Sequence, residues 1–183
     1  MKTFSVPTLE SAPEASRPIF EALTAKLGMV PNLYAVEGYS AGALKGSLDF
    51  AQALEAGVFS SKEAQAIYLA VSEVNQCSYC LAAHTMLGTM VGFSKEDTFD
   101  LRAGTPSDTK LRALTQLARA ITETHGRPSE ALVDAFFDAG YDDQALIELI
   151  GLVSVKTFSN YVHNLTQVPV DFPAAEPLQL AAA

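Results

Sequence analysis

The sequence predicts an all-α protein, and two kinds of observation lead to this fold class. Signals for β-structure are scarce, because apolar residues do not alternate with a period of two and neither Asn-Gly nor Asp-Gly occurs. Helical periodicity, by contrast, is clear. Between positions 108 and 125 the apolar side chains recur on one helical face, which comprises Leu111, Leu114, Leu117, Ala118 and Ile121. We therefore expect a compact multi-helix domain.

Residues that start and end helices recur along the chain. Ser60 and Glu63 fit a capping box, in which the serine side chain accepts a backbone N–H and the glutamate bonds back to the helix start. Gly57 suits the end of the preceding helix, Pro128 the first turn of a later one, and Gly140 its end. Together these signals predict helices at about residues 14–27, 32–38, 40–56, 61–76, 78–91, 95–102, 108–125, 129–139 and 143–165.

Length and composition favour one globular domain. The chain has 183 residues, of which 49% are apolar and 18% charged, enough for a single core. We expect one domain over residues 1–183, with extended arms at 1–13 and 169–183. No secretory signal is visible and no run approaches the ~18 consecutive apolar residues of a membrane helix, so we expect a cytoplasmic protein. The net charge of −9 argues against nucleic acid and membrane as partners, since both favour a cationic surface.

A weak internal similarity raises the alternative of a degenerate repeat. Aligning residues 65–84 with residues 144–163 gives four identities in twenty positions, a level that two apolar helices also reach by chance. In this alignment Cys77 and Cys80 fall opposite Lys156 and Ser159. If the repeat is real, only its first copy retains the cysteines.

The two cysteines stand three residues apart in a segment with other reactive side chains. In a helix, Cys77 and Cys80 share one face, and so do Cys80 and His84. Glu73 lies four residues before Cys77 and would extend the same face. We expect residues 75–76 to break the preceding helix, which places Cys77 in the first turn of a new one. The unpaired N–H groups at a helix start favour an anionic thiolate.

This spacing favours redox chemistry over two alternatives. The imidazole of His84 can take a proton from Cys80, and the second sulfur can trap an oxidised first sulfur as a disulfide. A zinc site is the first alternative, although Cys77, Cys80 and His84 supply only three local ligands and would need His125 or His163 as a fourth. The second alternative is a pair of inert buried cysteines. We expect neither a metal nor a bound cofactor.

The pattern Cys-x-Tyr-Cys-x-x-x-His, preceded by Glu-x-Asn, resembles the core motif of the alkylhydroperoxidase D and carboxymuconolactone decarboxylase superfamily. Residues 71–88 are similar to its peroxidase-related branch in particular. The Pro-Asn-Leu-Tyr stretch at 31–34 and the Val-Pro-Val-Asp-Phe-Pro stretch at 168–173 resemble the same branch. The resemblance covers about residues 20–173.

This resemblance implies a fold, an assembly and roles for single residues. Such proteins are all-helical, form trimers or hexamers, and include thiol peroxidases that use the cysteine pair. Cys80 would match the cysteine that attacks peroxide, Cys77 the resolving cysteine, and His84 the histidine of the proton relay. The chain departs from the family at Gln65, where a glutamate is usual, so the proton relay is either incomplete or taken over by Glu73. Tyr79 stands where the best-known members carry histidine.

The sequence thus predicts a peroxidase or disulfide oxidoreductase that acts on a hydroperoxide and is regenerated by an external dithiol reductant. We expect a homo-oligomer. One alternative is a redox-sensing or assembly protein whose cysteines oxidise without turnover. A weaker alternative is a lyase that acts on a carboxylated lactone, like the decarboxylases of the superfamily, although these typically lack the cysteine pair.

Overall fold

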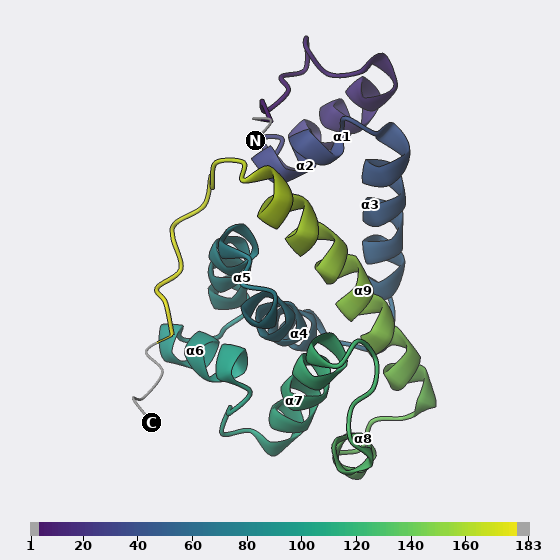
Figure 1. The fold of residues 1–183 in the computed structure, drawn as a ribbon, viewed down its shortest axis with the longest axis vertical. Helices are drawn as coiled ribbons and strands as arrows, with labels where there is room; N and C mark the ends of the chain where they lie inside the picture. The colour runs from purple at the N-terminus through teal and green to yellow at the C-terminus, as the bar shows by residue number, and fades with distance from the viewer. Residues whose placement is uncertain (1–3, 179–183) are drawn as a thin grey trace.

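The computed structural model describes residues 4–178, and within that range it is helical without any strand. The all-α prediction is confirmed. The elements are a short 3-10 turn η1 (Glu14–Ser16) and the helices α1 (Arg17–Leu27), α2 (Asn32–Glu37), α3 (Ala41–Glu55), α4 (Ser61–Val74), α5 (Ser78–Met90), α6 (Lys95–Ala103), α7 (Thr109–Glu123), α8 (Glu130–Asp138) and α9 (Asp143–Thr166). Figure 1 shows α4 and α9 crossing the centre, with the other helices arranged around them.

Helix α4 is the hub of the core and packs against α5, α6, α7 and α9. One of its sides enters the largest apolar cluster, where Ile67 and Val71 meet Leu117 of α7 and Leu149 of α9, all fully buried. Burying each such side chain typically contributes about 1.5–3 kcal/mol. This packing fixes α4, and with it the segment that follows α4 and carries the cysteines.

A second apolar cluster joins α1, α2 and α3 through Phe20, Leu23, Ala35 and Leu44. Helix α9 connects this cluster to the main core, because it contacts α2 and α3 as well as α4 and α7. By length and composition α9 could also cross a membrane. That is weak support for a membrane span, because core helices of soluble proteins meet the same criteria and α9 packs against the core.

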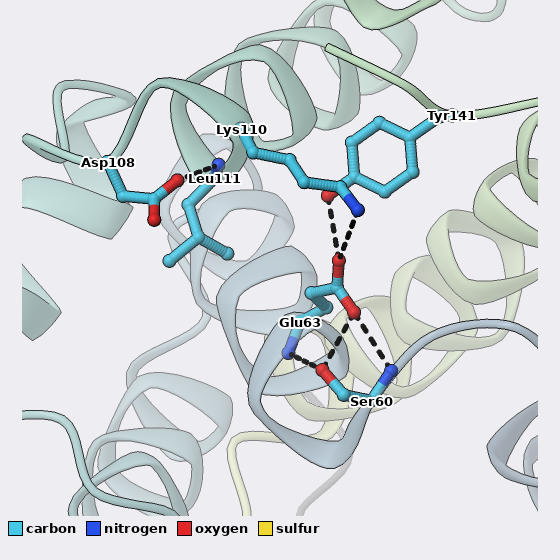
Figure 2. Close-up of polar contacts among 6 residues, drawn as sticks. All are labelled: Ser60, Glu63, Asp108, Lys110, Leu111 and Tyr141. Atoms are coloured by element: carbon cyan, nitrogen blue, oxygen red, sulfur yellow. Dashed lines mark hydrogen bonds and ion pairs between the residues drawn. The ribbon is translucent and has the colours of Figure 1, made fainter.

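The helix ends are fixed by the predicted polar side chains. The capping box of α4 is complete, because the hydroxyl of Ser60 accepts from the Glu63 N–H at 3.2 Å and Glu63 accepts from the Ser60 N–H at 3.0 Å. Glu63 also accepts a hydrogen bond from the Tyr141 hydroxyl at 2.9 Å and lies 3.9 Å from the Lys110 ammonium (Figure 2). Asp108 caps α7 in the same way through the Leu111 N–H. These contacts tie the starts of α4 and α7 together.

The chain leaves α9 as an extended C-terminal arm that passes beside α5 toward α6 (Figure 1). Lys95 of α6 pairs with Glu176 of the arm at 2.5 Å, and Arg102 donates to the Glu176 carbonyl. The outer parts of the two predicted arms, residues 1–3 and 179–183, lie outside the described residues.

Candidate active site around Cys77 and Cys80

The break between α4 and α5 sets the position of the cysteines. Helix α4 ends at Val74, and Gln76 takes a left-handed backbone conformation with φ of 52°. Two amides of α9 hold the break: Asn160 accepts from the Asn75 side chain at 2.9 Å, and Asn164 donates to the Asn75 carbonyl at 2.7 Å. Cys77 is therefore the N-cap of α5, the position at a helix start that its sequence context predicted.

The two thiols face each other inside the protein. Cys77 is fully buried and Cys80 is 2% exposed, and both are free thiols. The Cys80 N–H donates to the Cys77 sulfur over 3.3 Å, and the Cys77 thiol hydrogen-bonds to the Cys80 sulfur. Both sulfur atoms therefore lie on one side of the helix start. Oxidation of this pair to a disulfide remains a prediction.

The pair is electrostatically unequal. The pKa of Cys80 is lowered to about 7, chiefly because the Cys77 thiol donates a hydrogen bond to the Cys80 sulfur. Burial raises this pKa, whereas the Lys156 ammonium lowers it further. The pKa of Cys77 is raised, because its proton is held in that hydrogen bond and its sulfur is buried. As pH rises, Cys80 therefore ionises first, around pH 7, while Cys77 keeps its proton.

His84 lies one helical turn beyond Cys80 on α5, and its side chain bonds to residues of other helices. Its Nδ1 is 2.8 Å from the Gln65 side-chain oxygen, and its Nε2 is 2.5 Å from the Lys156 Nζ. Because the Gln65 oxygen can only accept, Nδ1 carries the proton and Nε2 accepts from lysine. Burial and the Lys156 charge lower the pKa of His84 well below its usual value, so the ring is neutral. Within residues 4–178 no hydrogen bond joins Cys80 to His84, so the direct proton transfer that we expected between them has no path. The Nε2 of the ring is bound by Lys156 instead.

Lys156 is the residue that connects these groups, and sequence reasoning missed it. Its ammonium lies against His84 and 4.4 Å from the centre of the Tyr68 ring, and its charge favours the Cys80 thiolate. Lys156 is the only cation along α9, where it follows an apolar run. A lone lysine in an apolar helix was the signal that could have identified it. In the repeat alignment it stands opposite Cys77.

A buried carboxyl group on α2 belongs to the same cluster and was also missed. Glu37 is 4% exposed, its Oε2 accepts from the Ser47 hydroxyl at 3.2 Å, and its Oε1 has no hydrogen-bond partner among the described residues. Burial raises its pKa to about 7, with a smaller contribution from Cys80, against the opposing effects of Ser47, Lys156 and the Ser159 hydroxyl. Nothing in the sequence around Glu37 distinguishes it from a surface glutamate.

Glu73, the expected substitute base, is bound by a different partner. Its Oε2 accepts from the Arg102 guanidinium of α6 at 2.7 Å, and Arg102 is 2% exposed. None of its hydrogen bonds or ion pairs within residues 4–178 reaches the cysteines or His84. The helical spacing expected between Glu73 and Cys77 does not apply, because α4 ends at Val74 and Gln76 takes a left-handed backbone conformation. A relay role for Glu73 stays a prediction that none of its contacts supports.

Tyr79, between the cysteines, joins the start of α5 by hydrogen bonds to α2 and to the C-terminal arm. Its hydroxyl donates to Asp171 of the C-terminal arm at 2.6 Å and accepts from the Leu33 N–H of α2 at 3.3 Å. Asp171 also accepts from the Asn32 N–H at 2.8 Å. The three segments that resemble the superfamily thus meet at one point. His163 lies against the Tyr79 ring, with centroids 5.4 Å apart.

Metal binding finds no support in the side-chain arrangement of residues 4–178. No group of three or more histidine, cysteine, aspartate and glutamate side chains is placed there to hold an ion. His125 is exposed at the end of α7, and His163 packs on Tyr79. Neither joins Cys77, Cys80 and His84 as a fourth ligand.

Restoring the carboxylate usual in the superfamily at position 65 should speed turnover. Because Gln65 bonds to His84, a carboxylate there would make the ring a stronger acceptor for the Lys156 ammonium. We expect Gln65→Glu to raise peroxide consumption several-fold at neutral pH, within the ~10²–10⁴-fold that acid–base assistance can supply. Gln144→Glu, an exposed position on α9, is the matched control. An unchanged rate would mean that the cluster already has an adequate carboxyl group.

Residues 41–123 match the sequence model of the carboxymuconolactone decarboxylase family. A search of curated proteins gave no match. Among solved structures, an uncharacterised peroxidase-related protein from Silicibacter sp. TM1040 is 22% identical with a TM-score of 0.77, covering 94% of this chain and 91% of that one.

Two further solved structures share the fold. The alkylhydroperoxidase AhpD core, an uncharacterised peroxidase-related protein from Ralstonia eutropha JMP134, is 21% identical with a TM-score of 0.78, covering 88% of each chain. The debrominase Bmp8, in complex with 2,3,4-tribromopyrrole, is 17% identical with a TM-score of 0.77, covering 93% of each chain. At these identities the similarity shows the fold alone.

Proposed function

Since the chain belongs to the alkylhydroperoxidase D and carboxymuconolactone decarboxylase superfamily, we propose that it is a thiol-dependent peroxidase that reduces hydroperoxides through Cys80 and Cys77. The observation that carries the proposal is the unequal thiol pair. The buried Cys80 sulfur has a pKa lowered to about 7 by the Cys77 thiol and by Lys156, as a peroxide-attacking thiolate requires. Cys77, directly beside it, retains its proton and is placed to resolve the oxidised sulfur.

The proposed reaction has two oxidative steps. First, the Cys80 thiolate attacks the terminal oxygen of the hydroperoxide; an S–O bond forms, the O–O bond breaks, and the departing alkoxide takes a proton from Lys156 to leave as alcohol. Second, Cys77 loses its proton and attacks the sulfur of the Cys80 sulfenic acid; the S–S bond forms and the S–O bond breaks. The departing hydroxide takes the proton of Cys77 and leaves as water.

An external dithiol reduces the disulfide and closes the cycle, becoming a disulfide itself. The sum converts one hydroperoxide and one dithiol into an alcohol, water and a disulfide. The cycle therefore needs a compartment that supplies reduced dithiols, and we place the protein in the cytoplasm. Its chemistry requires no bound cofactor, because both electrons come from the cysteine pair.

His84 has a positioning role in this proposal. Its neutral ring, fixed by Gln65, accepts from the Lys156 ammonium and so holds the cation whose charge favours the Cys80 thiolate. Lys156 favours the thiolate before the reaction and is the acid for the leaving alkoxide during it. In a site this buried, one positioned cation has a large effect on the transition state.

The test is peroxide consumption with dithiothreitol as the reductant. Wild type should turn over repeatedly, and both Cys77→Ser and Cys80→Ser should not. If the cysteines only sense oxidants, wild type will oxidise once and stop even with excess dithiol. Consumption of a carboxylated lactone without peroxide, retained in both variants, would instead favour a lyase. Loss of bromide from 2,3,4-tribromopyrrole in the same assay would point to a substrate like that of Bmp8.

We propose that the protein is a homo-oligomer, a trimer or hexamer as in its superfamily, assembled through the outer face of α9. Exposed apolar side chains recur there at helical spacing and lie on one stripe, opposite the face that carries Lys156: Ile147, Ile150, Phe158, Tyr161 and Leu165. Ile147 and Leu165 are 68% and 70% exposed in the single chain. An exposed apolar stripe of this kind, although Ser154 interrupts it, marks an interaction surface.

Charging this stripe should dissociate the assembly. We expect light scattering to give a trimer or hexamer for wild type and a smaller species for Ile147→Glu/Leu165→Glu, because two buried carboxylates would each cost several kcal/mol at an apolar interface. Met90→Glu, equally exposed but at the end of α5, should retain the wild-type mass. A monomeric wild type at micromolar concentration would contradict the proposal.

A further inference from the structure

Both sulfur atoms of the proposed redox pair are closed off from solvent. Cys77 is fully buried and Cys80 is 2% exposed. A dithiol reduces a disulfide by direct attack of its thiolate on one of the sulfur atoms, so that sulfur has to be accessible. In this conformation a dithiol cannot make the contact. Part of the structure that covers the pair must therefore move in each cycle.

The segments that cover the cysteines are not equally fixed. The apolar residues packed around the pair come from α2, α5, α9 and the C-terminal arm: Leu33, Tyr79, Val162 and Phe172, in that order. The three helices pack against other helices of the fold, whereas residues 167–178 of the arm lie outside any helix. Segments of this kind open at a lower free energy than core helices do. The arm is therefore the cover that can be displaced without unfolding the core.

A small set of hydrogen bonds holds the arm over the pair. Asp171 accepts from the Tyr79 hydroxyl at 2.6 Å through one oxygen and from the Asn32 N–H at 2.8 Å through the other. The Asn32 side chain also donates to the Pro169 carbonyl at 3.0 Å. Next to this contact, the Phe172 ring meets the Tyr79 ring edge-on, with centroids 5.5 Å apart. One carboxylate thus joins the arm to both α5 and α2.

The arm has a suitable hinge where it leaves α9. Gln167, the residue that ends α9, takes a left-handed backbone conformation with φ of 51°. Val168, which follows it, is 2% exposed and anchors the root of the arm. Hinges commonly lie at the ends of such elements, where a few residues absorb the change in backbone angles. Displacement of the arm beyond Val168 would therefore leave α9, and with it Lys156, in place.

We propose that the C-terminal arm is the lid of the thiol pair and that Asp171, held by Tyr79 and Asn32, is its latch. This inference rests on the proposed peroxidase function: the closed lid shields the Cys80 thiolate from other reagents, and the open lid admits the external dithiol. Tyr79 is a positioning residue, because its hydroxyl holds the latch. Phe172 is the side chain of the arm that packs beside the cysteines, so it sets how large a reagent can enter.

The experiment measures how fast the reduced cysteines react with two maleimides of different size. The chain has two cysteines, so every label reports on this pair. Fluorescein maleimide is bulky, N-ethylmaleimide is small, and the ratio of their rates does not depend on how far the thiol is ionised. Asp171→Asn cannot accept both bonds of the latch, and Phe172→Ala removes the cover itself. Both variants should raise the ratio of the bulky to the small reagent on the order of 10-fold.

Asp138→Asn, a change of an exposed aspartate on α8, is the matched control and should keep the wild-type ratio. If Asp171→Asn and Phe172→Ala also keep the wild-type ratio, the arm is not a lid and the inference is overturned.

A loss of overall stability has a different signature from the opening of a lid. Lid opening exposes little surface, so labelling of Asp171→Asn should hardly change with urea below the unfolding transition. Leu117→Ala, which removes a buried side chain of α7, is the reference for global unfolding, and its labelling should rise steeply with urea. An equally steep rise in Asp171→Asn would assign its labelling to unfolding and overturn the inference.

Labelling requires no peroxide, so the lid and the proposed function are tested separately. If wild type consumes no peroxide while Asp171→Asn shows the raised ratio, the peroxidase proposal fails and the lid stands. If wild type turns over while the ratio stays unchanged in both arm variants, the lid fails and the peroxidase proposal stands. When both hold, dithiothreitol should reduce the oxidised form of Asp171→Asn faster than that of wild type, because the lid is open more often.

Discussion

Cys80→Ser is expected to abolish peroxide reduction, by on the order of 10³-fold or more, because it removes the attacking sulfur itself. Cys77→Ser should behave differently. It should consume one peroxide per subunit and accumulate sulfenic acid on Cys80, since the first step needs only the thiolate and Lys156. Trapping with a dimedone reagent followed by mass spectrometry distinguishes the two variants.

Two physical effects compete in this assignment. The helix N-terminus favours an anion at Cys77, an effect of about 0.3–1 kcal/mol for an exposed group. The hydrogen bond from Cys77 to the Cys80 sulfur, together with the Lys156 charge, acts in the opposite direction and lowers the pKa of Cys80 to about 7. The structure therefore favours Cys80. If Cys77→Ser is inert and Cys80→Ser accumulates sulfenic acid, the roles are reversed.

Lys156→Gln should have the second largest effect, a loss of about 10²–10³-fold in peroxide consumption at pH 7. Two contributions add, because the Cys80 thiolate loses a neighbouring cation and the alkoxide loses its acid. The pKa of Cys80 should rise in this variant. The rate of iodoacetamide alkylation as a function of pH measures that change directly.

Lys156→Arg separates the two contributions. A guanidinium keeps the positive charge but does not release its proton in proteins, so alkylation of Cys80 should stay near the wild-type rate while peroxide consumption falls. Lys26→Gln, an exposed lysine on α1, is the neutral control. If Lys156→Gln retains full activity, the cluster around His84 has no part in the reaction.

The local part of this site was predictable from the sequence, because it depends on short-range geometry. The polar residues at 75–76 indicated a helix break, and the three-residue spacing placed Cys77 and Cys80 together at the start of α5. The helix boundaries followed equally from capping residues such as Ser60, whose interactions lie within four residues. Such signals do not depend on how the helices pack.

The remote part was not predictable in this way. Lys156 and Glu37 act on the thiol site only because α9 packs against both α5 and α2, and this packing depends on residues far apart in the sequence. The four-residue spacing of Cys80 and His84 predicted that they share one side of α5. It could not predict that the His84 ring bonds to Gln65 and Lys156. The partner of Glu73 was not predictable either, because its carboxylate binds Arg102 of α6, a residue 29 positions along the chain.

The most direct test of the account is the ionisation of Cys80 in the reduced protein. Thiolate absorbance near 240 nm, followed from pH 4 to 10, should show one transition with a midpoint near 7, absent in Cys80→Ser and shifted upward in Lys156→Gln. Alkylation mapped by mass spectrometry should place that thiolate on Cys80. A single transition near the value of an ordinary thiol, about 8.5, or one that disappears in Cys77→Ser with Cys80 unmodified, would contradict the account.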